Sequence, residues 1–97
     1  MIYVKLHKGV SGAVVAVCDK ELLGKIFTEG KYKLKVSEFF YKGKEVNEDE
    51  AGEIMKDAEN LNIVGERSIE IAMKLGIVSE KNIIKISGVK HAQSITC

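Results

Sequence analysis

The alternation of apolar and polar residues predicts several β-strands along the chain. Ile2–Leu6 and Lys31–Val36 place apolar side chains at every second position, a pattern typical of strands with one face in water. Val14–Cys18 is an unbroken apolar run, which indicates a strand buried in the centre of a sheet. Ile83–Ile86 is the last strand that the pattern clearly predicts, and Gln93–Thr96 is expected to be extended or frayed.

Two helices are predicted in the second half of the chain. Asn47 and Glu50 have the form of a capping box. Behind them, apolar residues recur at helical spacing, namely Ala51, Ile54, Met55, Ala58 and Leu61. A second helix is expected over residues 65 to 75, where apolar positions surround much of the axis, and Gly76 is placed to end it.

Short connecting segments complete the predicted element order. Asp19 is expected to cap a short helix at Lys20–Leu23. Glu38–Tyr41 and Lys44–Val46 flank Lys42-Gly43, which predicts a hairpin or a tight turn. Early strands, two adjacent helices and a late strand indicate an α+β fold. We therefore expect one small domain over residues 1–97, with a mixed β-sheet and two main helices packed on one face.

Composition places the chain among globular proteins. The 97 residues are 45% hydrophobic and 30% charged, which suits a single hydrophobic core. No apolar run reaches the roughly 18 residues of a membrane helix, and the first residues do not resemble a signal peptide. We therefore expect a cytoplasmic protein without membrane contact. Two cysteines do not form a disulfide framework.

Charge is distributed unevenly although the net charge is only +1. Residues 1–44 contain nine lysines and four acidic residues, and residues 45–80 contain three basic and ten acidic residues. The first region includes a strip of lysines close to aromatic residues, namely Lys31, Lys33, Lys35, Lys42 and Lys44. Lysines beside aromatic rings are how single-stranded RNA is often held. The alternative is that these lysines simply keep an exposed sheet face in water.

Three polar stretches at the ends of apolar elements are candidates for one pocket. Their residues are Cys18, Asp19, Asn62, Gly65, Glu66, Arg67, His91 and Gln93. Cysteine beside a carboxylate suits a nucleophile if a base lies nearby, whereas a buried cysteine followed by a capping aspartate is the structural alternative. Amides at a helix start can hold an anion, although a carboxylate of the chain can occupy the same place.

Neither a metal nor another cofactor is predicted. Histidine and cysteine are zinc ligands, but His7, Cys18, His91 and Cys97 contain no pair at the spacing of a zinc motif. The polar residues Gly88–Gln93 are expected to form a loop after the strand Ile83–Ile86. In this loop, His91 and Gln93 are better suited to hydrogen bonding with RNA, a peptide carbonyl or a small ligand than to general-base catalysis. No partner carboxylate for His91 is identified in the sequence.

Several short segments of the sequence, taken together, resemble the archaeal family DUF424. They are VVAVCD at 14–19, LLGK at 22–25, FYKG at 40–43, NLNIVGER at 60–67 and GVKHAQ at 88–93. The resemblance covers nearly the whole chain, with one departure: the family commonly has proline before the histidine, where this chain has Lys90. It implies a cytoplasmic archaeal protein, one site shared by the three polar stretches, and an association with translation.

These observations favour a non-enzymatic RNA- or ribosome-associated binding protein, with RNA or translation factors as partners. In this hypothesis the lysine strip contacts phosphate and His91 with Gln93 makes specific contacts. One alternative is a small enzyme or ligand-binding domain with a pocket around Cys18, Glu66 and His91. Another is a protein-interaction module that uses the acidic helix Glu48–Glu59.

Overall fold

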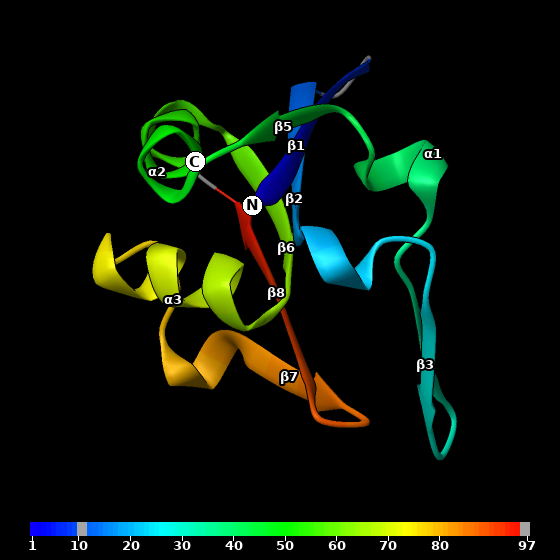
Figure 1. The fold of residues 1–97 in the computed structure, drawn as a ribbon. Helices are drawn as coiled ribbons and strands as arrows, with labels where there is room; N and C mark the ends of the chain where they lie inside the picture. Colours follow the sequence, from blue (N-terminus) through cyan, green and yellow to red (C-terminus); the bar gives the residue numbers. More distant parts are fainter. Residues whose placement is uncertain (10–11, 96–97) are drawn as a thin grey trace.

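A six-stranded mixed sheet forms the centre of the molecule in the computed structural model, which describes residues 1–9 and 12–95 (Figure 1). The strand order is β5-β1-β2-β6-β8-β7. β2 and β6 are parallel, and the other neighbouring strands are antiparallel. The strands are β1 (Ile2–Gly9), β2 (Gly12–Asp19), β5 (Lys44–Val46), β6 (Asn60–Val64), β7 (Ile83–Ile86) and β8 (Val89–Ile95).

Different elements cover the two faces of this sheet. α2 (Glu48–Asp57) and α3 (Glu66–Lys74) lie on one face (Figure 1). The other face carries α1 (Glu38–Tyr41) and the hairpin of β3 (Ile26–Glu29) with β4 (Tyr32–Lys35). Two single turns of 3-10 helix, η1 (Lys20–Leu22) and η2 (Glu80–Asn82), complete the fold. The predicted α+β class, with two main helices on one sheet face, is confirmed.

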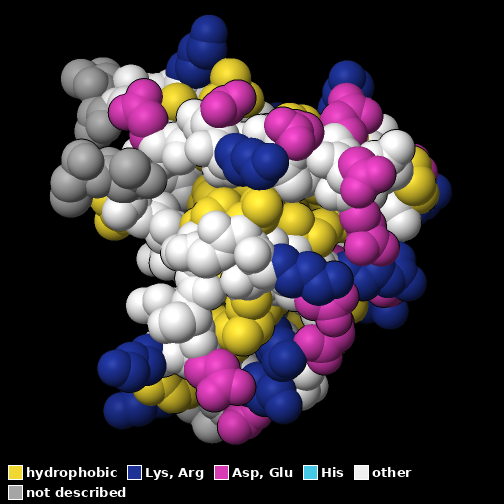
Figure 2. Space-filling view, turned by 90° about the vertical axis from the view of Figure 1, so that its left-hand side faces the viewer, with side chains coloured by type: hydrophobic (Ala, Val, Ile, Leu, Met, Phe, Trp, Pro, Cys, Tyr) yellow, Lys and Arg dark blue, Asp and Glu magenta, His cyan; other side chains and the backbone are white. Residues whose placement is uncertain are grey.

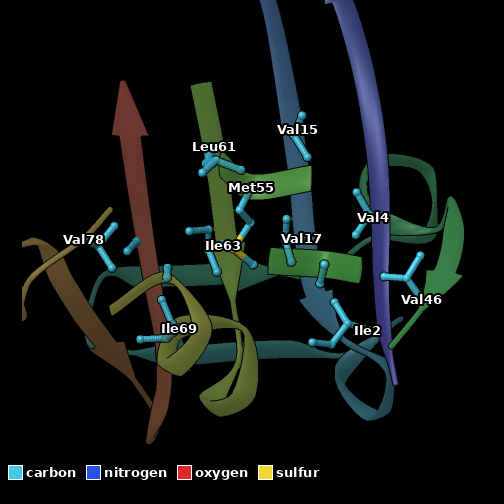
Figure 3. Packing of buried hydrophobic residues seen from close by; sticks show 13 residues of the cluster. Ile2, Val4, Val15, Val17, Val46, Met55, Leu61, Ile63, Ile69 and Val78 are labelled. Atoms are coloured by element: carbon cyan, nitrogen blue, oxygen red, sulfur yellow. The ribbon is translucent and has the colours of Figure 1, made fainter. Parts of the chain in front are cut away.

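The larger hydrophobic cluster lies between the sheet and the two helices (Figure 3). Alternate residues of the strands point into it because successive side chains of a strand face opposite sides. The labelled members are Ile2, Val4, Val15, Val17, Val46, Met55, Leu61, Ile63, Ile69 and Val78. Each fully buried side chain of this kind stabilises the fold by about 1.5–3 kcal/mol relative to exposure.

A second, smaller cluster lies under the hairpin and α1. Its buried members are Ala16, Cys18, Leu34, Val36, Tyr41, Val64 and Ile86. The hairpin is fastened to the β7–β8 turn, where the Ser87 backbone N–H donates to Glu29 Oε1 at 2.7 Å and the Ser87 hydroxyl donates to the Thr28 carbonyl. This part of the sheet is therefore closed, and the remainder of the same face is left open.

Two central strands differ from the sequence-based expectation. The periodicity predicts helix as far as Leu61, but α2 ends at Asp57 and Leu61 belongs to β6. Residues 89–93 were expected to form a loop, but they belong to β8. In both segments polar residues alternate with small or apolar ones, and pairing with β2 and β7 supplies the hydrogen bonds that make them strands.

Local capping explains several element boundaries. Asn47 caps α2 as predicted, because its Oδ1 accepts from Glu50 N at 2.8 Å. Gly76 ends α3 with φ at +74°. Glu38–Tyr41 is a helix rather than an arm of a hairpin, since Ser37 Oγ caps it through Phe40 N at 3.2 Å. Among the described residues, no helix has the length and apolar character to cross a membrane.

Candidate functional site

The three predicted polar stretches meet in the sheet. Cys18 pairs with Val64, and Val64 pairs with His91, so β2, β6 and β8 carry them in one row. Residues that follow one another in a strand nevertheless point to opposite faces. The eight candidate residues are therefore divided among four environments rather than gathered in one pocket.

Cys18 lies in the smaller hydrophobic cluster and has no exposed surface. Burial, together with the negative charges of Asp19 and Glu21, raises the pKa of its thiol to about 12. A nucleophilic cysteine requires a lowered pKa. The structure therefore places Cys18 as a core residue with a raised pKa and not as an activated nucleophile.

Asp19 caps a helix, but not the one that follows it in the chain. η1 receives no side-chain hydrogen bond from Asp19. Instead the carboxylate accepts from the first turn of α3: Arg67 N at 3.0 Å, Ser68 N at 2.9 Å and Ser68 Oγ at 2.7 Å. The predicted cap on Lys20–Leu23 is thus wrong. The N–H groups in the first turn of α3 have no partner within that helix, and they lie beside Asp19 at the end of the sheet, where its carboxylate accepts from them.

Gly65 provides the space for this cap. Its φ is +113°, and a Cβ there would lie 2.4 Å from Asp19 Cγ. Glycine is the residue that adopts this backbone conformation without steric cost. The start of α3, one candidate anion site, is therefore already filled by a carboxylate of the chain itself.

Glu66 and Arg67 form surface ion pairs beside this cap. Glu66 Oε2 lies 2.7 Å from Lys90 Nζ, and the hydrogen bond from Lys90 lowers the pKa of Glu66. Arg67 Nη2 lies 3.7 Å from Glu21 Oε2. Lys90 and His91 point to opposite faces of β8, so Glu66 and His91 are separated by the sheet.

The remaining candidates line an open groove on the sheet face that α2 and α3 do not cover. Three hollows of about 320, 270 and 430 Å³ adjoin one another across β8, β6 and β2. The first and second share Gln93, and the second and third share Val14 and Asn60. We call this the amide groove, after its polar residues Asn60, Asn62, Asn82 and Gln93, which two histidines accompany.

A hydrogen-bond network fixes the groove's middle. Tyr41 Oη donates to Asn62 Oδ1 at 2.7 Å, and His91 Nε2 lies 3.0 Å from the same oxygen. Burial lowers the pKa of His91, which favours the neutral ring. With Nε2 donating to Asn62, the Nδ1 atom of that neutral ring is left as an acceptor.

The aromatic ring of Phe40 in α1 forms one wall of the amide groove. Phe40 lines it and stacks on His7, with ring centroids 4.5 Å apart. His7 Nε2 is also 2.7 Å from the Phe40 carbonyl oxygen. Next to it, Phe39 is 81% exposed, and Lys5 Nζ lies 5.0 Å from the centre of its ring.

The predicted lysine strip is divided into two groups. Lys31, Lys33 and Lys35 belong to the β3–β4 hairpin and are exposed, with no ion pair among the described residues. Lys42 and Lys44 pair with Glu38 at 3.8 Å and with Glu50 at 2.9 Å. The hairpin contacts β7, which is the opposite sheet edge from the β5 strand of Lys44.

The chemistry of the amide groove is that of neutral hydrogen bonding. Its lining residues in the described chain include one lysine and no carboxylate, so His91 has no acidic partner there for general-base work. Within residues 1–9 and 12–95, no three His, Cys, Asp or Glu side chains are grouped to hold a metal. Cys97, one of the ligands weighed from the sequence, lies outside the described residues.

Four residues in or beside the amide groove were not predicted as members of the candidate pocket. They are Asn60, Asn82, Tyr41 and His7. The alternation Asn60-Leu61-Asn62-Ile63 was an available signal, since it places two amides on one face of a strand. For Tyr41 and His7 only the packing of α1 against β1 and β2 supplies the connection.

The fold and groove define an α+β domain with a helix-covered face and a neutral, amide-lined face. The family model described as "Protein of unknown function (DUF424)" matches residues 8–97, and the chain belongs to this family. A solved structure, an uncharacterized conserved protein from Methanopyrus kandleri, is similar with a TM-score of 0.81 and 27% identity. The similarity covers 99% of this chain and 93% of that one. No curated protein matches the sequence.

Proposed function

We propose that this protein is a non-enzymatic RNA-binding protein that holds a single-stranded segment in the amide groove. The observation that carries the proposal is the groove itself. It consists of three adjoining hollows in which amides, histidines and one lysine lie among apolar residues beside the ring of Phe40, without a carboxylate among the described lining residues.

The side chains of the groove suit the edges of unpaired bases. Gln93 offers a donor and an acceptor together, and its direct neighbour Asn62 on β6 offers its NH2 group, since Asn62 Oδ1 already accepts from Tyr41 and His91. Sequence-specific RNA recognition targets splayed bases, which stack on aromatic or histidine side chains and are hydrogen-bonded at their edges. Phe40 and His7 supply such rings in the lining of the amide groove.

Phosphate contacts are assigned to the lysines without ion pairs. Lys8 lines one end of the amide groove, and the hairpin presents Lys31, Lys33 and Lys35. Lys42 and Lys44 are withdrawn from this role because acidic side chains already neutralise them. The proposal thus keeps three of the five lysines from the sequence analysis and adds Lys8.

We place this activity in the cytoplasm, in association with the ribosome or with translation factors. The support is the expectation that the sequence resemblance raised. Affinity purification from native cells with and without nuclease tests it. Co-purification of ribosomal proteins that is lost after nuclease treatment supports the proposal. Co-purification of the same proteins that nuclease does not change contradicts an RNA-mediated association.

Fluorescence anisotropy tests the groove directly. The probe is a fluorescein-labelled, mixed-sequence RNA of about ten nucleotides, a length within the range of known single-strand sites. Gln93→Ala removes hydrogen bonds and should weaken binding about 2- to 10-fold. The combined change Lys33→Ala and Lys35→Ala should make the salt dependence shallower by about 1.4 in log–log slope, since each phosphate contact contributes about 0.7.

The matched control is the combined change Lys56→Ala and Lys74→Ala. These lysines lie on α2 and α3 and carry the same total charge. Equal loss of affinity in both double variants would show non-specific attraction and contradict the proposed surface. The same RNA annealed to its complement should bind more weakly, because paired bases cannot enter the groove, and duplex binding of equal strength would also contradict it.

A further inference from the structure

The opposite face of the molecule contains a second hollow, which lies between α2 and α3. Its volume is about 260 Å³, and Gly52 with Ile71 and Leu75 forms its apolar floor. Charged residues stand around it: the acidic Glu48, Asp49 and Glu53 of α2, together with Lys56 and Lys74. Figure 2 shows hydrophobic side chains exposed between charged side chains on this face. We call this hollow the helix groove.

Gly52 has no structural reason to be glycine. It lies in the middle of α2, where glycine is less stable than alanine. A Cβ at this position would lie 3.5 Å from Ile71 Cγ2 and 3.8 Å from Leu75 Cδ1, which are ordinary packing distances. Close packing of α2 on α3 therefore does not require its absence. The absence of a side chain at Gly52 leaves the floor of the helix groove open.

The charges at the rim favour a basic partner. Lys56 is paired with Glu53 at 3.2 Å, and Lys74 is paired with Glu70 at 3.6 Å, each within its own helix. Glu48 and Asp49 form no ion pair among the described residues. An apolar floor beneath unpaired carboxylates is complementary to a segment that carries an aliphatic side chain between cationic ones.

We infer that the helix groove is a docking surface for a lysine- or arginine-rich segment of another protein, with one aliphatic side chain seated over Gly52. Apolar contact on the floor provides the anchor, and the rim carboxylates orient the cations. The inference is independent of RNA binding, because it uses the other face of the sheet and different residues.

A peptide titration followed by 15N–1H NMR tests this inference. The protein is labelled with 15N, and the probe is an unlabelled peptide of alternating lysine and leucine. It should shift the amide resonances of Gly52, Ile71 and Leu75, and a lysine–serine peptide should bind more weakly because it lacks the anchor. A glutamate–leucine peptide should not bind. Equal binding of all three peptides, or shifts confined to other residues, would overturn the inference.

Variants separate the floor from the rim. The change Gly52→Leu fills the floor and should abolish binding, whereas Gly52→Ala fits the available space and should weaken binding while the protein stays folded. The combined change Glu48→Gln and Asp49→Asn should weaken binding about 2- to 30-fold, from two exposed charge contacts. If Gly52→Leu does not fold, Gly52→Ala and the rim variant still decide the question.

The matched control for the rim is the combined change Glu59→Gln and Glu80→Gln, which removes the same charge outside the helix groove. It should leave peptide affinity unchanged. An equal effect of both double variants would overturn the docking site, as would unchanged affinity in Gly52→Ala. Concentration-dependent self-association that competes with the peptide, measured by light scattering, would assign the groove to a second copy and also overturn the inference.

Discussion

The cap that Asp19 forms on α3 permits a quantitative test of how this fold is held together. Asp19 is 2% exposed and accepts from two backbone N–H groups and one hydroxyl, all in the first turn of α3. The change Asp19→Ala leaves the buried Ser68 N–H without an acceptor and removes the acceptor of the part-buried Arg67 N–H. The buried group costs about 1–3 kcal/mol and the part-buried hydrogen bond about 0.5–1.5 kcal/mol, and loss of the negative charge at the helix start adds about 0.3–1 kcal/mol.

The expected cost of Asp19→Ala is therefore about 2–5 kcal/mol. That is a large share of the roughly 5–15 kcal/mol that a domain of this size has in total. Asp19→Asn should cost less, about 1–3 kcal/mol. Its one oxygen can still accept from Ser68, while its NH2 group faces the Arg67 N–H. Urea unfolding at constant m-value measures both changes.

Gly65 supplies an internal control for the same reasoning. In the wild-type protein Gly65→Ala meets the Asp19 carboxylate at 2.4 Å and an unfavourable φ of +113°. In the Asp19→Ala background only the φ cost remains, so the two changes together should cost less than their sum. Asp57→Ala, an exposed carboxylate on α2, should stay within about 0.5 kcal/mol of wild type. A cost of Asp19→Ala below about 1 kcal/mol, or strict additivity with Gly65→Ala, would refute the cap.

Three further predictions concern single residues. Cys18, with a pKa of about 12, should resist iodoacetamide at pH 8 in the folded protein, as peptide mass mapping can check; rapid alkylation would contradict its burial. Burial lowers the pKa of His91 below its unfolded value, so the unfolded chain binds more protons near pH 6 and stability should fall as pH drops below about 6.5. His91→Gln should flatten this part of the Tm–pH curve, and an unchanged curve would exclude His91 as its source. Gly52→Ala should raise the unfolding free energy by about 0.5–1 kcal/mol in urea, and a loss would show that α2 needs glycine for packing.

Local signals predicted the elements whose causes are local. The capping residue Asn47 and the terminal glycine Gly76 act within a few residues of their helices, and both have the predicted roles. The apolar run at Val14–Cys18 correctly indicated a buried central strand. The error at Leu61 arose because this residue fits two patterns equally well. It continues the helical spacing of the apolar residues in α2, and it alternates with polar neighbours as in a strand. Only pairing with β2 decides between them.

The candidate site shows the same division. Three of the predicted pocket residues, Asn62, His91 and Gln93, lie together in the amide groove. Four others lie elsewhere: Cys18 is in the core, Asp19 caps a helix, and Glu66 and Arg67 form surface ion pairs. Proximity along a strand does not reveal which face a side chain occupies until the register is known.

By itself, then, the sequence determined the α+β class, the start of α2, the end of α3 and the uneven distribution of charge, because hydrophobic periodicity, capping and composition are properties of short segments. Tertiary structure alone decided that Asp19 serves α3 rather than η1, that Tyr41 reaches Asn62, and that β6 and β8 stand side by side. Each of these joins groups that lie far apart along the chain. Their energy comes from burial and from hydrogen bonds that exist only once the sheet has closed.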